Sequence, residues 1–126
     1  MRVLLDTHTF LWAISDDSRL SPTVRSLMAG GECCFSVASI WEVIVKAKTK
    51  KISLPEPVGP FLISELAASR VRILSITLNH VLRIEGLDLH HRDPFDRMLV
   101  AQCLEENIPI LTADPFFRNY PVRVIW

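Results

Sequence analysis

Four acidic residues stand where short apolar segments meet helical ones, and this placement could build a metal site. Asp6 and Asp114 directly follow apolar runs that have the character of buried strands. Glu42 and Asp96 are expected in the first turns of two helices. Because ligands of open α/β sheets bind beyond the carboxyl ends of the strands, all four side chains could reach one edge of the sheet.

Each acid taken alone has an ordinary explanation as a helix cap. Aspartate before a helix is a frequent N-cap, and carboxylates in the first turn favour the positive end of the helix dipole. Asp93-Pro94 and Asp114-Pro115 both suit a cap followed by proline at the first helical position. Ser39 and Glu42 have the spacing of a capping box. A single residue therefore does not decide between capping and catalysis.

Convergence of the four acids is what favours catalysis. Two carboxylates about 5 Å apart repel by roughly 3 kcal/mol at an effective dielectric near 20, and a small domain is stable by only about 5–15 kcal/mol. A divalent cation removes this repulsion, and hard oxygen ligands select Mg²⁺ or Mn²⁺. Such a site hydrolyses phosphodiesters, because the metal lowers the pKa of the attacking water and stabilises the leaving oxygen.

Other polar residues near these acids could support such a site. The hydroxyls of Thr7 and Thr112 could orient a carboxylate or a metal-bound water, or could satisfy local backbone groups. Arg97 could hold a phosphate, although an outward-facing arginine is equally consistent with the pattern. Lys46 lies four residues after Glu42 and could extend along the same helix face toward a phosphodiester substrate.

Composition sets limits on the class of protein. A chain of 126 residues predicts a single domain over residues 1–126. Its 14 lysines and arginines balance 14 aspartates and glutamates, which argues against a purely electrostatic nucleic-acid binder. The apolar segment Arg2–Leu5 is too short for a signal peptide or a membrane span, so a soluble cytoplasmic protein is expected.

The three cysteines indicate buried, reduced thiols. Cys33 and Cys34 are adjacent, and Cys103 lies far away in a helical pattern. An odd number of cysteines with no C-x-x-C spacing argues against a disulfide framework or a zinc finger.

Short apolar strands alternate with helices along the chain. The predicted strands cover Arg2–Leu5, Cys33–Val37, Val71–Ile76, Ile108–Thr112 and Val122–Ile125. This alternation predicts an α/β domain with a central, mainly parallel sheet of about four to five strands and helices on both faces.

Seven helical segments are expected between and after these strands. They follow Asp6, run from Ser21-Pro22 to about Met28, follow the second strand, run from about Pro60 to Ser69, open at Thr77, cover Pro94–Glu106, and form a turn at Pro115–Arg118. Several carry apolar positions at helical spacing, which we expect to face the core. These positions are Phe10, Leu11 and Ile14; Ile40, Val43, Ile44 and Ala47; Leu78, Val81 and Leu82; and Phe95, Met98, Leu99 and Cys103.

The ordered set of motifs resembles the PIN-domain nucleases, and within them the VapC-type toxins of bacterial toxin–antitoxin pairs. The matching stretches cover essentially the whole chain. They are Leu4-Leu-Asp-Thr-His8, Ser39-Ile-Trp-Glu-Val43, His91-Arg-Asp-Pro-Phe-Asp-Arg-Met-Leu99 and Leu111-Thr-Ala-Asp114.

The resemblance implies a PIN fold, cleavage of RNA that depends on Mg²⁺ or Mn²⁺, a homodimer, and an antitoxin that blocks the site. By position, the family's four acids correspond to Asp6, Glu42, Asp96 and Asp114. Asp93 is an additional acid next to the third of them, and we assign it to capping because it precedes Pro94.

The histidines and tryptophans favour ordinary roles. His8, His90 and His91 lack the spacing of a closed zinc site, and the adjacent pair is expected in a surface loop near the crevice. The three tryptophans, Trp12, Trp41 and Trp126, are expected in the core or at an interface.

Two other functions compete with a ribonuclease. The first is a non-catalytic PIN-like module that binds a partner protein and nucleic acid and uses the acids only as caps. The second is phosphoryl-transfer signalling on a similar sheet. The phosphoacceptor aspartate and strand-end lysine that it requires are not supplied by Ser75–Thr77 or by Leu111–Asp114, and His8 stands where a D-x-D phosphatase has its second acid.

Overall fold

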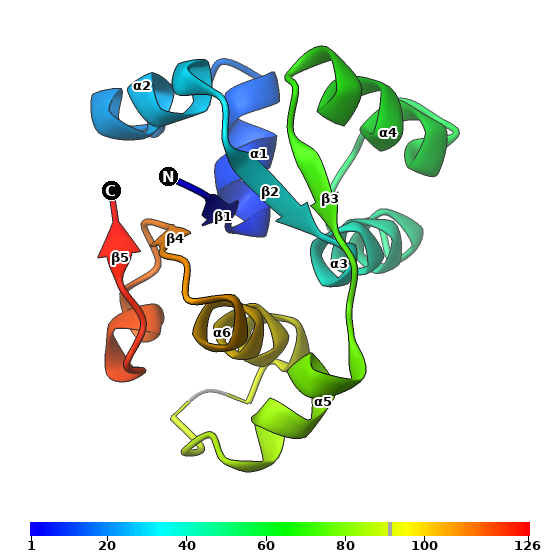
Figure 1. Ribbon diagram of the computed structural model, residues 1–126. Coiled ribbons are helices and arrows are strands. Elements are labelled where there is room, and N and C mark those ends of the chain that lie inside the picture. Colours follow the sequence, from blue (N-terminus) through cyan, green and yellow to red (C-terminus); the bar gives the residue numbers. More distant parts are fainter. Residues whose placement is uncertain (91) are drawn as a thin grey trace.

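The computed structural model describes residues 1–90 and 92–126 as a five-stranded parallel sheet flanked by helices (Figure 1). The strand order is β3-β2-β1-β4-β5. The strands are β1 (Val3–Leu5), β2 (Cys33–Ser36), β3 (Arg72–Leu74), β4 (Ile110–Leu111) and β5 (Val124–Ile125). The α/β class, the parallel sheet and the strand count are thus confirmed.

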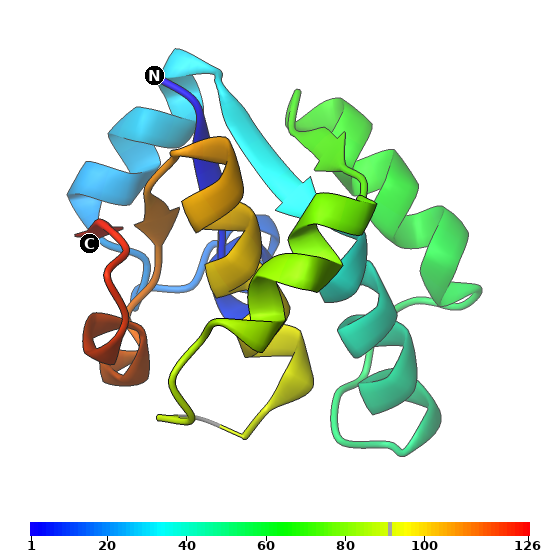
Figure 2. The same ribbon diagram turned by 60° about the horizontal axis from the view of Figure 1, so that its bottom comes forward.

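Helices connect successive strands and cover both faces of the sheet. They are α1 (Thr7–Ile14), α2 (Pro22–Gly30), α3 (Val37–Lys48), α4 (Val58–Ala68), α5 (Leu78–Glu85) and α6 (Pro94–Glu106), followed by the 3₁₀ helix η1 (Pro115–Asn119). In Figure 1, α1, α2 and α4 lie on one side of the sheet and α5 and α6 on the other. Figure 2 shows α5 packed along α6.

Two apolar cores share the sheet because side chains of a strand alternate between its faces. In β1, Val3 and Leu5 pack toward α1, α2 and α4, whereas Leu4 packs toward α6. Phe10 of α1 and Phe35 of β2 form the centre of the first core, with ring centroids 4.8 Å apart. The structure places the carboxyl ends of β1, β2 and β4 between these two helical layers.

Two helices, α2 and α6, begin at the caps predicted from the sequence. Ser21 accepts a hydrogen bond from Val24 N–H, with Pro22 at the first helical position. Asp93 accepts from the backbone N–H groups of Phe95 and Asp96. The boundaries of α6 are those predicted from the sequence.

One predicted cap is wrong. Ser36, not Ser39, is the N-cap of α3, because the hydroxyl of Ser36 accepts from Ala38 N–H. Glu42 therefore lies in the second turn of α3 rather than the first, and Ser39 and Glu42 do not form a capping box. The side chains of Ser39 and Glu42 are both buried, and both contact the hydroxyl of Thr7 at the start of α1.

The expected inward face of α5 is also wrong. Leu78, Val81 and Leu82 are 71%, 48% and 57% exposed. The buried face of α5 instead contains His80, whose Nδ1 accepts from Thr77 N–H while Nε2 lies 3.1 Å from Glu106 Oε2 on α6. An apolar stripe on a helix predicts that this face will be covered, but the described part of the chain leaves this face of α5 exposed.

Smaller differences concern the ends of elements and one position of α3. Ile44 is 38% exposed, although Val43 beside it is fully buried. The strands β3, β4 and β5 are shorter than predicted, α2 extends to Gly30, and α4 begins at Val58. Gly31 ends α2 with a φ of 92°, a left-handed conformation that suits glycine.

Candidate functional site

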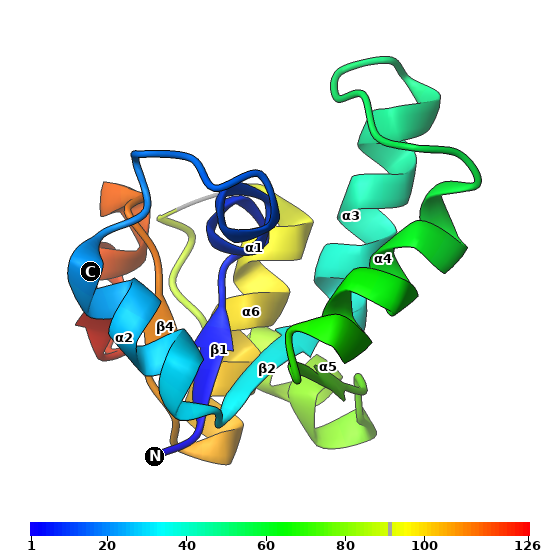
Figure 3. The same cartoon turned by 90° about the horizontal axis from the view of Figure 1, so that it is seen from above.

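Asp6 is buried, with 4% of its surface exposed. It ends β1, and its own N–H donates to the carbonyl of Leu111 in β4, 3.1 Å away. Its Oδ1 accepts from Thr7 N–H at 2.8 Å, and its Oδ2 accepts from the hydroxyl of Thr112 at 2.8 Å. Figure 3 shows β1 running into α1, with α6 behind it and α3 to one side. The fold therefore fixes this carboxylate at the junction of the sheet and α1.

Glu42 lies next to Asp6 and is also buried. Its Oε1 accepts from the hydroxyl of Thr7 at 2.7 Å, and that hydroxyl also lies 2.8 Å from Ser39 Oγ. Its Oε2 accepts from Lys46 Nζ at 2.6 Å, one turn further along α3. Lys46 is thus turned toward the acidic residues.

Asp114 is joined to Asp6 through one hydroxyl. Thr112 donates to Asp6 and accepts from the backbone N–H of Asp114 at 3.0 Å. Asp114 also caps η1, since its Oδ1 accepts from Phe116 N–H at 3.0 Å. The two carboxylates border the same hollow between α1 and the segment after β4. Asp114 therefore combines a capping role with a position at the acidic site.

Asp93 and Asp96, at the start of α6, lie near Lys46. Partial burial lowers the pKa of Lys46, but the hydrogen bond and charge of Glu42 and the charges of Asp93 and Asp96 outweigh this effect and raise it above its ordinary value. The edge-to-face contact of Trp41 with Phe95, whose ring centroids are 4.9 Å apart, packs α3 against the first turn of α6. Asp93 and Asp96 thus lie on the Lys46 side of the site.

Burial makes the negative charge of Asp6 unfavourable. Burial raises its pKa, the hydrogen bonds from Thr112 and Thr7 and the nearby His8 lower it, and the charge of Glu42 raises it again. The net effect is a pKa above the ordinary aspartate value. A cation close to Asp6 and Glu42 would reverse this balance, because an opposite charge favours the ionised form.

These residues fit a hard divalent cation by their chemistry. All donors of Asp6, Glu42, Asp96 and Asp114 are carboxylate oxygens, the ligands that Mg²⁺ and Mn²⁺ prefer. Within residues 1–90 and 92–126, however, no three His, Cys, Asp or Glu side chains are gathered closely enough to hold a metal ion. The structure pairs Asp6 with Thr112, and Glu42 with Thr7 and Lys46.

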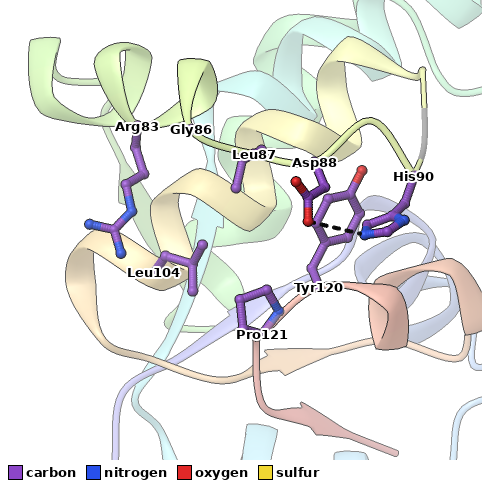
Figure 4. Close-up of a pocket in the computed structure, with 8 residues that line it drawn as sticks. All are labelled: Arg83, Gly86, Leu87, Asp88, His90, Leu104, Tyr120 and Pro121. Atoms are coloured by element: carbon purple, nitrogen blue, oxygen red, sulfur yellow. Dashed lines mark ion pairs between the residues drawn. The ribbon is translucent and has the colours of Figure 1, made fainter.

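Arg97 contacts a loop rather than the acids in the hydrogen bonds that can be described. Its Nη1 donates to the carbonyl of Asp88 at 3.0 Å and lies 3.4 Å from the hydroxyl of Tyr120. In Figure 4, Asp88 and His90 lie beside Tyr120, with His90 Nε2 3.7 Å from Asp88 Oδ2. His90 also stacks edge-on against Tyr120, with ring centroids 5.2 Å apart. These contacts tie the loop before Asp93 to α6 and η1.

The remaining candidates have the surroundings of structural residues. Cys33, Cys34 and Cys103 are free and buried, as expected. Burial and, to a smaller extent, the adjacent Cys34 together raise the pKa of the Cys33 thiol to about 11. Trp41 is 59% exposed and therefore lies outside the core. His91, expected in the surface loop, lies outside the described residues.

Ser39 and Thr9 belong to the site but were not singled out from the sequence for it. Ser39 contacts the hydroxyl of Thr7, and Thr9 donates to the carbonyl of Leu111 at 2.8 Å. Both are almost completely buried. The pattern of serine and threonine in Asp6-Thr7-x-Thr9 could have indicated a buried polar network, because buried hydroxyls require partners.

Comparison with known proteins identifies the family. The sequence matches the family model of the PIN domain over residues 3–122, and the chain therefore belongs to the PIN-domain family. Among curated proteins, no sequence matches this chain significantly.

Solved structures share the fold over nearly their whole length. A chain of DNA-bound VapBC from Salmonella typhimurium is 18% identical, with a TM-score of 0.75 and coverage of 99% of this chain and 97% of that one. VapBC2 from Rickettsia felis, bound to a promoter DNA fragment, is 15% identical, with a TM-score of 0.70 and coverage of 99% and 98%. FitAcB from Neisseria gonorrhoeae is 16% identical, with a TM-score of 0.65 and coverage of 98% and 96%. At these identities the similarity establishes the fold.

Within the described parts of the chain, no helix is both long and apolar enough to cross a membrane.

Removing the charge of Asp6 should stabilise the protein at neutral pH when metal ions are chelated. Because the folded-state pKa of Asp6 is raised, its contribution to stability falls as the pH rises through the interval between its unfolded and folded pKa values. In EDTA, Asp6→Asn should therefore melt at a higher temperature than the wild type at pH 7. The difference should vanish below the ordinary aspartate value of 3.8.

Thermal unfolding followed by circular dichroism measures this effect. Asp88→Asn is the matched control, because the Asp88 side chain is 87% exposed and its neutralisation should change the melting temperature little. A lower melting temperature for Asp6→Asn than for the wild type at pH 7 would contradict the account of Asp6 as an unfavourably buried charge.

Proposed function

We propose that this chain is a metal-dependent endoribonuclease that hydrolyses RNA phosphodiester bonds and acts as the toxin of a toxin–antitoxin pair. The observation that carries the proposal is the buried Asp6 carboxylate, which is held by Thr7 and Thr112 beside Glu42 at the carboxyl ends of parallel strands. Helix capping does not require two buried carboxylates to lie close together, and a cation beside Asp6 and Glu42 would offset the cost of burying their charges. Residues 1–126 are proposed to form a single nuclease domain.

Four carboxylates would hold the cation, Mg²⁺ or Mn²⁺: Asp6, Glu42, Asp96 and Asp114. When bound, such a cation activates a water for attack on phosphorus and stabilises the leaving oxygen. Thr112 orients Asp6 and links it to Asp114, while Thr7 orients Glu42. These hydroxyls keep the carboxylates in fixed positions, which limits the reorganisation needed during the reaction.

Lys46 has a second task in this proposal. Its ammonium pairs with Glu42 and lies close enough to Asp93 and Asp96 to be influenced by their charges. We propose that it offsets the acidic charge before the cation and RNA bind, and afterwards offers a cation to an RNA phosphate. Asp93 remains a cap of α6, and Arg97 fixes the loop at Asp88.

The partners follow from the family and the structural neighbours. One similar structure is a toxin–antitoxin complex from Klebsiella pneumoniae, 17% identical with a TM-score of 0.66 and coverage of 98% of this chain and 96% of that one. By analogy, we propose that a cognate antitoxin binds this chain and blocks the acidic site. An activity on cellular RNA places the protein in the cytoplasm in this proposal.

The exposed stripe of α5 supports a homodimer. Leu78, Val81 and Leu82 are each about half exposed or more, which is unusual for three large apolar side chains on one short helix. Ile73, on the edge strand β3 that precedes α5, is 44% exposed as well. A two-fold axis beside this helix would cover the same stripe on both copies.

Neutralising Asp6 should abolish RNA cleavage. Asp6→Asn removes a carboxylate proposed to bind the cation and should reduce Mg²⁺-dependent cleavage of total RNA by at least about 100-fold, the loss typical of a group that stabilises transition-state charge. Gel analysis of RNA, with Asp88→Asn as the exposed acidic control, measures the effect. Full cleavage by Asp6→Asn would refute the proposed site, and its failure to relieve growth inhibition on expression would refute the toxin role.

A charge in the α5 stripe should dissociate the dimer. Leu82→Glu places a carboxylate in an interface that would exclude water, so this variant should sediment as a monomer at concentrations where the wild type is dimeric. Ile63→Glu is the control, because Ile63 is similarly exposed, at 47%, but lies on α4. A dimer that persists in Leu82→Glu but is lost in Ile63→Glu would place the interface on α4 instead.

A further inference from the structure

A hollow of about 180 Å³ opens beside the acidic site, between α1 and the segment that follows β4. Asp6 and Asp114 border it, and the rest of its lining is largely apolar or aromatic. The other lining residues are His8, Thr9, Trp12, Ala113 and Pro115. A ligand in this hollow would therefore be next to the two acids that the proposed reaction uses.

The aromatic wall of this hollow is held in place before any ligand binds. The guanidinium carbon of Arg19 lies 4.6 Å from the centroid of the Trp12 ring. Trp126 contacts the same ring edge-on, with centroids 5.7 Å apart. Arg19 is itself fixed by two hydrogen bonds to the carboxylate of Asp17, of 3.0 and 2.7 Å. A side chain that is ordered in advance loses little entropy when it binds a ligand.

His8 extends the wall toward the opening of the hollow. It lies one helical turn before Trp12 on α1, with ring centroids 6.4 Å apart and a tilt of 36° between the rings. The His8 side chain is exposed, whereas Trp12 is partly buried. A flat ring that enters the hollow would contact the aromatic side chains of His8 and Trp12. Pro115 also lines the hollow.

The charges around the hollow favour a neutral ring over a phosphate. Of the described residues that line it, none is Lys or Arg, and two are carboxylates. An anion would be repelled there, whereas a nucleobase is flat, uncharged and stacks well on aromatic side chains. The backbone phosphate would then lie outside the hollow, at the carboxylates proposed to bind the cation.

The hollow is large enough for the ring of a base. A cavity of about 150 Å³ is large enough to bind benzene, so a hollow of about 180 Å³ holds one six-membered ring. The hydroxyl of Thr9 is already used in a hydrogen bond to the Leu111 carbonyl. Recognition would therefore depend on shape and stacking more than on hydrogen bonds.

We infer that this hollow is a base subsite, in which an unpaired base of single-stranded RNA stacks on Trp12 and His8 beside the scissile phosphate. The inference rests on the proposed nuclease function and specifies its substrate as RNA that is unpaired at the cleavage site. In this inference, Trp12 and His8 determine specificity. The small side chain of Ala113 leaves space in the hollow for the base.

Nuclear magnetic resonance can detect a base in this hollow without any cleavage. Uridine 5′-monophosphate contains no phosphodiester bond between nucleotides, so it can be titrated in Mg²⁺ into the ¹⁵N-labelled protein. The indole N–H signals of Trp12, Trp41 and Trp126 are followed, with Trp12→Phe used to assign the first. The signal of Trp12 should shift saturably, and ribose 5-phosphate, which lacks the base, should not shift it.

A substitution that fills the hollow tests the inference without removing any side chain from the core. Ala113 is exposed, so Ala113→Phe adds a ring to the hollow while the core remains intact, and Ala113→Ser is the matched control. Ala113→Phe should weaken binding of uridine 5′-monophosphate by at least about five-fold, the lower end for loss of one base–aromatic stack. His8→Ala should weaken it in the same direction.

Three results would overturn the inference. The first is an equal response of Trp12 to ribose 5-phosphate, and the second is equal affinity of Ala113→Phe and Ala113→Ser. The third is no response of Trp12, including the case in which Trp41 responds instead and places the base between α3 and α6. RNA cleavage by the wild type is assayed separately. Cleavage without a Trp12 response refutes only the subsite, whereas a Trp12 response without cleavage refutes only the nuclease.

Discussion

The burial of one carboxylate governs the arrangement of this site. Asp6 ends the central strand β1, and its N–H continues the sheet by donating to Leu111. A buried ion is costly unless hydrogen bonds and opposite charges compensate it. The neighbouring elements supply this compensation: Thr7 begins α1, and Thr112 follows β4. The register of β1 and β4, in which Leu5 pairs with Leu111, brings these donors to the same carboxylate.

Lys46 explains how the acids can lie near one another before a cation binds. Its ammonium contacts Glu42 directly and is influenced by Asp93 and Asp96. It therefore supplies positive charge on the α3 and α6 side of the site, while Asp6 and Asp114 share the α1 side through Thr112. A divalent cation would add positive charge where the charge of Glu42 adds to the cost of ionising Asp6. In the proposed function, Lys46 and the cation would therefore act on different acids of the site.

Local sequence signals predicted much of the fold. Asp93-Pro94 marked the start of α6, and the structure confirms that Asp93 caps this helix. The parallel sheet followed from short apolar segments separated by helices. The acids were placed near one edge by the rule that functional groups of such sheets lie at the carboxyl ends of strands.

The incorrect predictions concern choices that depend on tertiary structure. Ser36 and Ser39 are both able to cap a helix, and only the end of β2 decides that Ser36 does so. The stripe of Leu78, Val81 and Leu82 has helical spacing, but spacing does not reveal whether the covering surface belongs to the same chain. The hollow at Trp12 was not predicted either, because it depends on a contact between α1 and the segment after β4.

Direct measurement of cation binding tests the central claim, namely that buried acids converge to hold a metal. Isothermal titration calorimetry of the full chain with Mn²⁺ should show saturable binding, and Asp6→Asn should remove it while Asp88→Asn retains it. Absence of saturable binding to the wild type, or equal binding to Asp6→Asn, would contradict the account and leave Asp6 and Asp114 as helix caps only.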